Sequence, residues 1–142
     1  MNKTSLTLVT LFALSLLILS ACASGGTASA SPMGEWTLVS YGDASNPAPA
    51  LSNVDTSLNF NEDGSFGGNV GCNSFGADYK VDGSHITFGS IVSTMMFCEE
   101  TSAQESAVLS ILTDKTLNYQ FNGNQLTLTS QDGTLVVVLA RK

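Results

Sequence analysis

The sequence predicts an all-β domain with one helix, arranged as an antiparallel β-barrel or half-barrel of about eight strands with the helix packed against it. Short segments alternate between apolar and polar residues, which is the period of a half-buried strand. Asp-Gly or Asn-Gly pairs lie between these segments and suit the backbone of tight hairpin turns. One further segment has the apolar spacing of an amphipathic helix. The four turn pairs are Asp63-Gly64, Asp82-Gly83, Asn122-Gly123 and Asp132-Gly133.

The chain has 142 residues and a formal charge of −7 at pH 7, and this length is typical of one domain. Because nucleic-acid phosphates require a basic protein face, the acidic balance excludes a nucleic-acid binder. It also offers no basic patch to anionic lipid headgroups. We therefore interpret the acidity as a contribution to solubility.

Residues 1–21 are predicted to be a bacterial lipoprotein signal peptide. Lys3 supplies the positive start, and the apolar run of residues 6–19 is short for a membrane span. The run ends in Leu19-Ser20-Ala21-Cys22, which resembles a lipobox, with small residues before a cysteine whose thiol accepts the lipid. The alternative is ordinary secretion, with cleavage at an alanine beside the cysteine.

Lipid on Cys22 would anchor the mature chain to a membrane of the cell envelope, facing the periplasm or the extracellular side. Residues 22–33 are mostly Ala, Ser, Gly and Thr and predict a flexible tether. The folded domain is then expected over residues 34–142. We expect this domain to be a monomer that also contacts an unknown envelope protein.

The alternating segments predict eight strands, most of them with one apolar face. The predicted strands are residues 35–41, 56–60, 65–70, 77–81, 85–88, 117–121, 126–128 and 134–140. The last strand is apolar on both faces, which predicts cover on both sides. Residues 42–55 form a polar stretch with two prolines, which we interpret as a mobile connection.

The predicted helix covers residues 99–112. Its apolar stripe consists of Ala103, Ala107, Val108, Ile111 and Leu112. Glutamates in its first half favour the positive end of the helix dipole. We expect this helix to cover the outer face of the last strand.

A glycine-rich motif and a second motif downstream carry a family resemblance. They are Gly71-Cys72-Asn73, followed by Phe75-Gly76, and Ser93-Thr94-Met95-Met96-Phe97-Cys98. With these residues the chain resembles the META domain of HslJ-like proteins over residues 34–142. The resemblance implies a small envelope domain, often a lipoprotein, without established catalysis and loosely associated with heat shock and antibiotic tolerance. Its motif residues here are Gly71, Cys72, Asn73, Thr94, Met95 and Cys98, and Phe97 replaces a usually small residue, which we interpret as a packing variation.

Cys72 and Cys98 remain once Cys22 is assigned to lipid, and three interpretations of this pair stay open. Outside the cytoplasm a disulfide persists and would stabilise the fold by roughly 3–4 kcal/mol. The pair could instead be reduced core thiols. As a metal site the pair would need further ligands, and His85 is the sole histidine of the chain. We predict no cofactor, no metal site and no catalytic residue.

The remaining glycines and methionines are expected to have structural roles. Glycines at 67, 68, 71 and 76 predict bulges or barrel corners more than a ligand surface. Met95 and Met96 are expected on opposite faces of a strand, packed in the core.

The predicted function is a non-catalytic binding or structural module of the envelope, with a link to stress or antibiotic tolerance that the family resemblance implies. This hypothesis expects an exposed apolar patch on the barrel rim or on residues 42–55. The alternative, a small-ligand or lipid-binding barrel, expects an apolar cavity. That cavity would be lined by Trp36, Leu58, Phe66, Phe88, Tyr119 and Phe121.

Overall fold

The computed structural model describes residues 31–142. The predicted signal peptide, Cys22 and the tether up to residue 30 lie outside the described residues. Within residues 31–142, no helix has both the length and the apolar character needed to cross a membrane.

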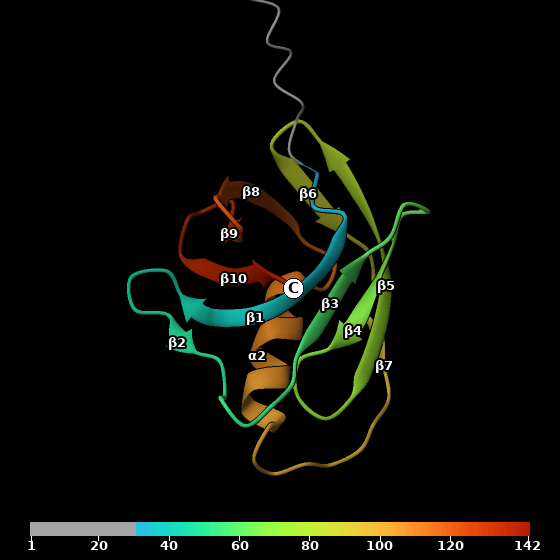
Figure 1. Ribbon diagram of the computed structural model, residues 1–142, viewed down its shortest axis with the longest axis vertical. Helices are drawn as coiled ribbons and strands as arrows, with labels where there is room; N and C mark the ends of the chain where they lie inside the picture. Colours follow the sequence, from blue (N-terminus) through green and yellow to red (C-terminus); the bar gives the residue numbers. More distant parts are fainter. Residues whose placement is uncertain (1–30) are drawn as a thin grey trace, which may run out of the picture. The chain divides into compact units, whose positions relative to one another are not determined.

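The described chain forms an antiparallel sheet that closes into a barrel, because the first long strand pairs with the last (Figure 1). The strands are β1 (Gly34–Asp43), β2 (Ala48–Pro49), β3 (Ser57–Phe60), β4 (Ser65–Asn69), β5 (Ser74–Asp82), β6 (His85–Phe88), β7 (Val92–Ser93), β8 (Thr116–Asn122), β9 (Gln125–Ser130) and β10 (Leu135–Arg141). The helix is α2 (Ser102–Leu112). Eight of the strands make the closed ring, since β2 and β7 are two-residue additions to its edges. The predicted fold class is confirmed.

Closure depends on β1, which pairs with β3 on one side and with β10 on the other. Trp36 lies opposite Leu58 of β3 and opposite Arg141 of β10. The register with β10 shifts between Leu38 and Ser40, as in a β-bulge. Such a shift bends a strand and increases its twist, which helps the sheet to close.

The four predicted turns lie where the sequence places them, in the hairpins β3–β4, β5–β6, β8–β9 and β9–β10. In the first, Gly64 has a φ of 82°, a conformation that suits glycine. Asp63 completes this turn, because its Oδ1 accepts hydrogen bonds from the backbone N–H and the hydroxyl of Ser65 at 2.9 and 2.6 Å. The local sequence therefore determines these connections.

The barrel interior is filled with side chains. The rings of Phe66 and Phe88 lie 4.8 Å apart, those of Tyr119 and Phe121 lie 5.7 Å apart, and Trp36 is fully buried. Five of the six residues predicted to line a cavity belong instead to one hydrophobic core, and the sixth, Phe121, is partly buried and packs against that core. The cavity that the ligand-binding alternative expects is therefore not formed by these residues.

The helix begins later and packs differently from the prediction. It starts at Ser102 and buries Gln104, Val108, Ile111 and Leu112, whereas Ala103 is exposed. Its apolar residues share a core with Val137 and Leu139, one face of β10. Val136, on the opposite face, is buried but lies outside that core. The expectation that the helix covers the outer face of the last strand is thus wrong, because α2 packs on the inner side.

Residues 42–55, predicted to be a mobile connection, make hydrogen bonds to the barrel and to the helix. Ala48 and Pro49 form β2 and pair with β1. The backbone N–H of Leu51 donates to Oε1 of Gln104 at 2.8 Å. Gln104 is buried in α2 and also donates to the carbonyl of Val70 at 2.6 Å. One side chain therefore fixes two loops against the helix.

Candidate functional site

The segment between β6 and α2 carries the most exposed large apolar side chains of the described chain. We call residues 91–98 the apolar loop. The exposed fractions are 75% for Val92, 95% for Met95, 61% for Met96 and 85% for Phe97. The prediction that the methionines pack in the core is wrong, because residues 94–98 form no strand. Phe97 is likewise no packing variation, since its ring faces solvent.

A disulfide joins the end of the apolar loop to the turn between β4 and β5. It links Cys72 and Cys98, whose Cα atoms are 6.1 Å apart. Of the three interpretations of this cysteine pair, the structure shows the disulfide. The bond fixes the last residue of the loop close to the start of α2.

The side chain of Asn73 supports the apolar loop through three hydrogen bonds. Its Oδ1 accepts hydrogen bonds from the backbone N–H of Met96 at 2.7 Å and from the hydroxyl of Thr94 at 2.8 Å. Its Nδ2 donates to the carbonyl oxygen of Met96 at 3.0 Å. The Asn73 amide therefore makes the two hydrogen bonds with the Met96 backbone that a neighbouring strand would otherwise make. The polar groups of the Met96 backbone are paired although Met96 lies in no sheet.

Glu105, in the first turn of α2, holds Asn73 in place. Its Oε2 accepts the backbone N–H groups of Cys72 and Asn73, both at 2.8 Å. Its Oε1 accepts Nδ2 of Asn73 at 2.6 Å. Burial raises the pKa of the Glu105 carboxyl group, but the hydrogen bonds from Asn73 and Cys72 outweigh burial and hold that pKa below its ordinary value. We call Cys72, Asn73, Thr94, Met96 and Glu105 the Asn73–Glu105 network.

Gly71 is required where the β4–β5 turn meets the helix. A Cβ atom at this position would lie 2.9 Å from Oε2 of Glu105 and 3.1 Å from its Cβ. Any larger residue would push Glu105 away from the N–H groups it accepts. The glycine of the motif is thus explained by close approach to a carboxylate.

The predicted motif residues come together around the apolar loop. Thr94, Met95 and Cys98 lie in the loop, where Met95 points to solvent. The other three, Gly71, Cys72 and Asn73, border or support it. Sequence reasoning missed Glu105 and Gln104. A polar Gln104 on the buried face of the helix, next to Glu105 in its first turn, was the available signal.

The arrangement is suited to support and not to proton transfer. Both carboxylate oxygens of Glu105 accept hydrogen bonds within the network. His85 lies elsewhere, exposed at the start of β6 opposite Asn118. Within residues 31–142, no group of three or more His, Cys, Asp and Glu residues is placed to hold a metal ion.

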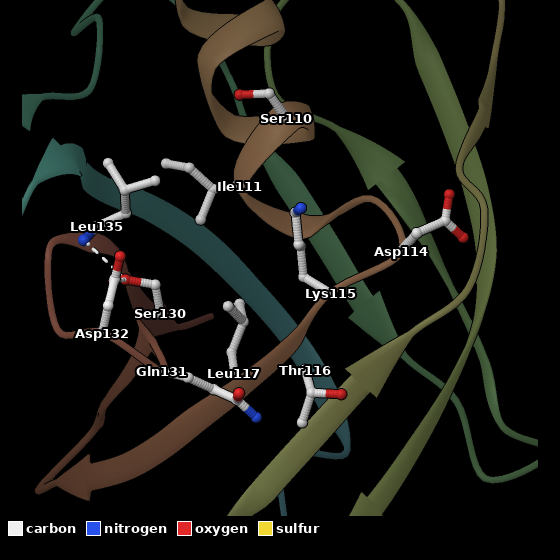
Figure 2. Close-up of a pocket in the computed structure, with 10 residues that line it drawn as sticks. All are labelled: Ser110, Ile111, Asp114, Lys115, Thr116, Leu117, Ser130, Gln131, Asp132 and Leu135. Atoms are coloured by element: carbon white, nitrogen blue, oxygen red, sulfur yellow. Dashed lines mark hydrogen bonds between the residues drawn. The ribbon is translucent and has the colours of Figure 1, made fainter.

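A separate pocket of about 470 Å³ lies where α2 ends and the β9–β10 turn begins (Figure 2). Its lining residues are Ser110, Ile111, Asp114, Lys115, Thr116, Leu117, Ser130, Gln131, Asp132 and Leu135. The carboxylate of Asp132 is engaged by Ser130 and Thr134, which lower its pKa to about 2. Figure 2 shows the Asp114 carboxylate pointing away from the apolar side chains of Ile111 and Leu117. The hydroxyl of Ser90 donates a hydrogen bond to this carboxylate at 2.8 Å. The pocket shares no residue with the Asn73–Glu105 network.

Comparison with known proteins agrees with the motif and the fold. The family model for the META domain matches residues 30–142. No curated protein matches the chain.

Solved structures share the fold at low identity. A protein from Burkholderia xenovorans, solved by NMR, superposes with a TM-score of 0.61 at 23% identity, covering 76% of this chain and 81% of that one. A DUF4847 family protein from Bacteroides vulgatus, solved by crystallography, has a TM-score of 0.54 at 18% identity, covering 77% of this chain and 92% of that one. These likenesses show the barrel architecture alone.

Proposed function

We propose, from the premise that the chain belongs to the META domain family, that it is a non-catalytic, lipid-anchored module of the cell envelope. In this proposal it binds a partner protein through the apolar loop. One observation carries the proposal: four apolar side chains project into solvent from a backbone that a disulfide and the Asn73–Glu105 network hold in place. A soluble domain seldom exposes such a cluster unless it is a contact surface.

The charge around the apolar loop indicates the chemistry of the partner. Glu99 and Glu100 follow the loop directly, and the chain has no Lys or Arg between Lys80 and Lys115. A second copy of the chain would bring like charges together, which disfavours self-association. The surface instead fits another protein that offers an apolar recess with a basic rim.

The acidic residues beside the apolar loop support a protein partner over an anionic membrane surface. Glu99 and Glu100 are exposed directly after the loop, and carboxylates are repelled by anionic lipid headgroups. In Figure 1, β1 begins at the end of the barrel that carries the β5–β6 hairpin, while the connection from β7 to α2 lies at the other end. The loop is therefore far from the first residues of the domain.

The contact can be tested by site-specific crosslinking of the full chain in its host. A photo-crosslinking phenylalanine derivative replaces Phe97 in one variant and exposed Val81 of β5 in the control. We expect a discrete protein adduct from position 97 and none from position 81. The purified complex should weaken about tenfold or more with Phe97→Ser and should weaken as salt rises. Equal adducts at both positions, or a complex that Phe97→Ser leaves intact, would contradict the proposal.

The anchor requires its own test. Mass spectrometry of the mature chain should find a diacylglyceryl-modified N-terminal Cys22, and globomycin should block processing of the precursor. Cys22→Ser should release the domain from the membrane fraction. Processing that ignores the drug would refute lipidation and leave the binding proposal standing.

The resemblance to HslJ-like proteins supports a role in stress or antibiotic tolerance. A host that lacks the chain should survive heat or novobiocin less well than its parent. Restoring the wild-type chain should rescue it, and restoring Phe97→Ser should not. Equal rescue by the wild-type chain and by Phe97→Ser would show that the role in tolerance does not depend on the apolar loop.

A further inference from the structure

We propose that Met95 and Met96 form an oxidation site, at which a peroxide makes the exposed surface of the apolar loop more polar while the barrel stays folded. The consequence for partner binding rests on the proposed function, whereas the oxidation itself does not.

The sulfur inventory of the described chain favours these two residues. Cysteine thiolates normally react first with oxidants, but Cys72 and Cys98 are already paired. The thioethers of methionine are then the available reduced sulfur. Met95 and Met96 are 95% and 61% exposed, compared with 41% for Met33. Met95 is therefore expected to be the most reactive of the three.

The reaction is a two-electron oxygen transfer with hydrogen peroxide as oxidant. A lone pair of the thioether sulfur attacks one peroxide oxygen, and the O–O bond breaks as the S–O bond forms. The sulfur is oxidised to the sulfoxide, and the second peroxide oxygen leaves as water after proton transfer. Each event adds one oxygen atom and replaces an apolar thioether by a polar group.

The structure indicates that this change stays local. The Asn73 side chain bonds to the backbone N–H and the backbone carbonyl of Met96, so neither hydrogen bond involves the Met96 side chain. The disulfide fixes the following Cys98. Neither methionine belongs to the hydrophobic core. Oxidation therefore changes two of the four exposed apolar side chains without removing a contact that the fold needs.

Peptide mapping by mass spectrometry after timed peroxide treatment of the mature chain tests the site. We expect Met95 to gain about 16 Da at least about threefold faster than Met33, with Met96 between them, because the order follows exposure. The thermal midpoint should stay within about 1 °C, and retention on a phenyl column should fall. Met33 reacting as fast as Met95, or unfolding during oxidation, would overturn the proposal.

Two variants separate surface chemistry from other effects of peroxide. Met95→Leu with Met96→Leu should keep its column retention under peroxide, since the loop stays apolar. Met95→Gln with Met96→Gln should show low retention before any peroxide is added. Loss of retention by the leucine variant would contradict the inference. Column retention needs no partner, so its result is independent of the crosslinking test.

Discussion

The barrel core and the apolar loop use the same kinds of side chain with opposite exposure. Phe66 in β4 is 2% exposed and packs on neighbouring rings, whereas Phe97 is 85% exposed. In β4 the backbone pairs with two other strands, and the pleat turns alternate side chains inward. Around Met96 the backbone of the apolar loop pairs with the side chain of Asn73 and with no strand, so no sheet face directs the neighbouring Phe97 inward. For these two phenylalanines, the partner of the backbone decides where the ring points.

The two phenylalanines offer the sharpest test of this comparison. Phe66→Ala should lower the free energy of unfolding by about 4 kcal/mol, because it leaves a cavity in a packed core. Phe97→Ala should change it by less than about 0.5 kcal/mol. Urea denaturation of both variants measures the difference. Similar losses at the two positions would show that the loop ring is part of the core.

Removing the disulfide should destabilise the fold and free the apolar loop from the barrel. The double variant Cys72→Ser, Cys98→Ser should lose about 3 kcal/mol, because the unfolded chain regains the freedom of a closed loop. Protease should then cleave within residues 91–98 before it cleaves the barrel. Wild-type protein in reductant serves as the control and should behave alike. A variant as stable and as resistant as the oxidised wild type would rule out this support.

The Glu105 carboxylate should contribute less than the disulfide but more than a surface acid. Glu105→Gln should lower the free energy of unfolding by about 2 kcal/mol, because an amide cannot accept all three donors as well as a carboxylate. Glu100→Gln removes an exposed acid from the same region and is the matched control, expected to be near neutral. Denaturation curves compare them, and equal effects would contradict the network.

The dependence of stability on pH gives the finest comparison. The pKa of Glu105 in the folded protein lies below its ordinary value of 4.5, so its carboxylate stabilises the fold above about pH 4.5. This contribution is lost as pH falls through the lowered pKa. The stability gap between wild type and Glu105→Gln should therefore shrink on acidification. Urea midpoints from pH 7 to pH 3 measure it, and a constant gap would show that the charge has no part.

The strands and hairpins could be predicted because their signals are local. Alternation of apolar and polar residues indicates a strand with one buried face. An aspartate beside a glycine forms its turn through contacts within a few residues, as Asp63 does with Ser65. The bounds differ by one to three residues at most strand ends, because pairing in the sheet extends some strands, such as β5, and ends others early, such as β4.

The support of the apolar loop could not be predicted because its contacts are distant in sequence. Glu105 accepts from Asn73 across 32 residues, and Gln104 donates to Val70 across 34. Without those contacts, Met95 and Met96 look like ordinary core residues. The family motif identified Asn73 and the cysteines, but it did not indicate that they carry an exposed surface.

The pairing of β1 with β10 has a consequence for biogenesis. Paired residues of the two strands are about a hundred positions apart in the sequence, with Thr37 opposite Ala140. Until β10 joins the sheet, the edge of β1 has no strand beside it and can pair with a neighbouring, incompletely folded chain. The ring is completed only when Leu135–Arg141 arrives. A premature stop codon before this strand would therefore yield an open, self-associating sheet instead of a slightly smaller domain.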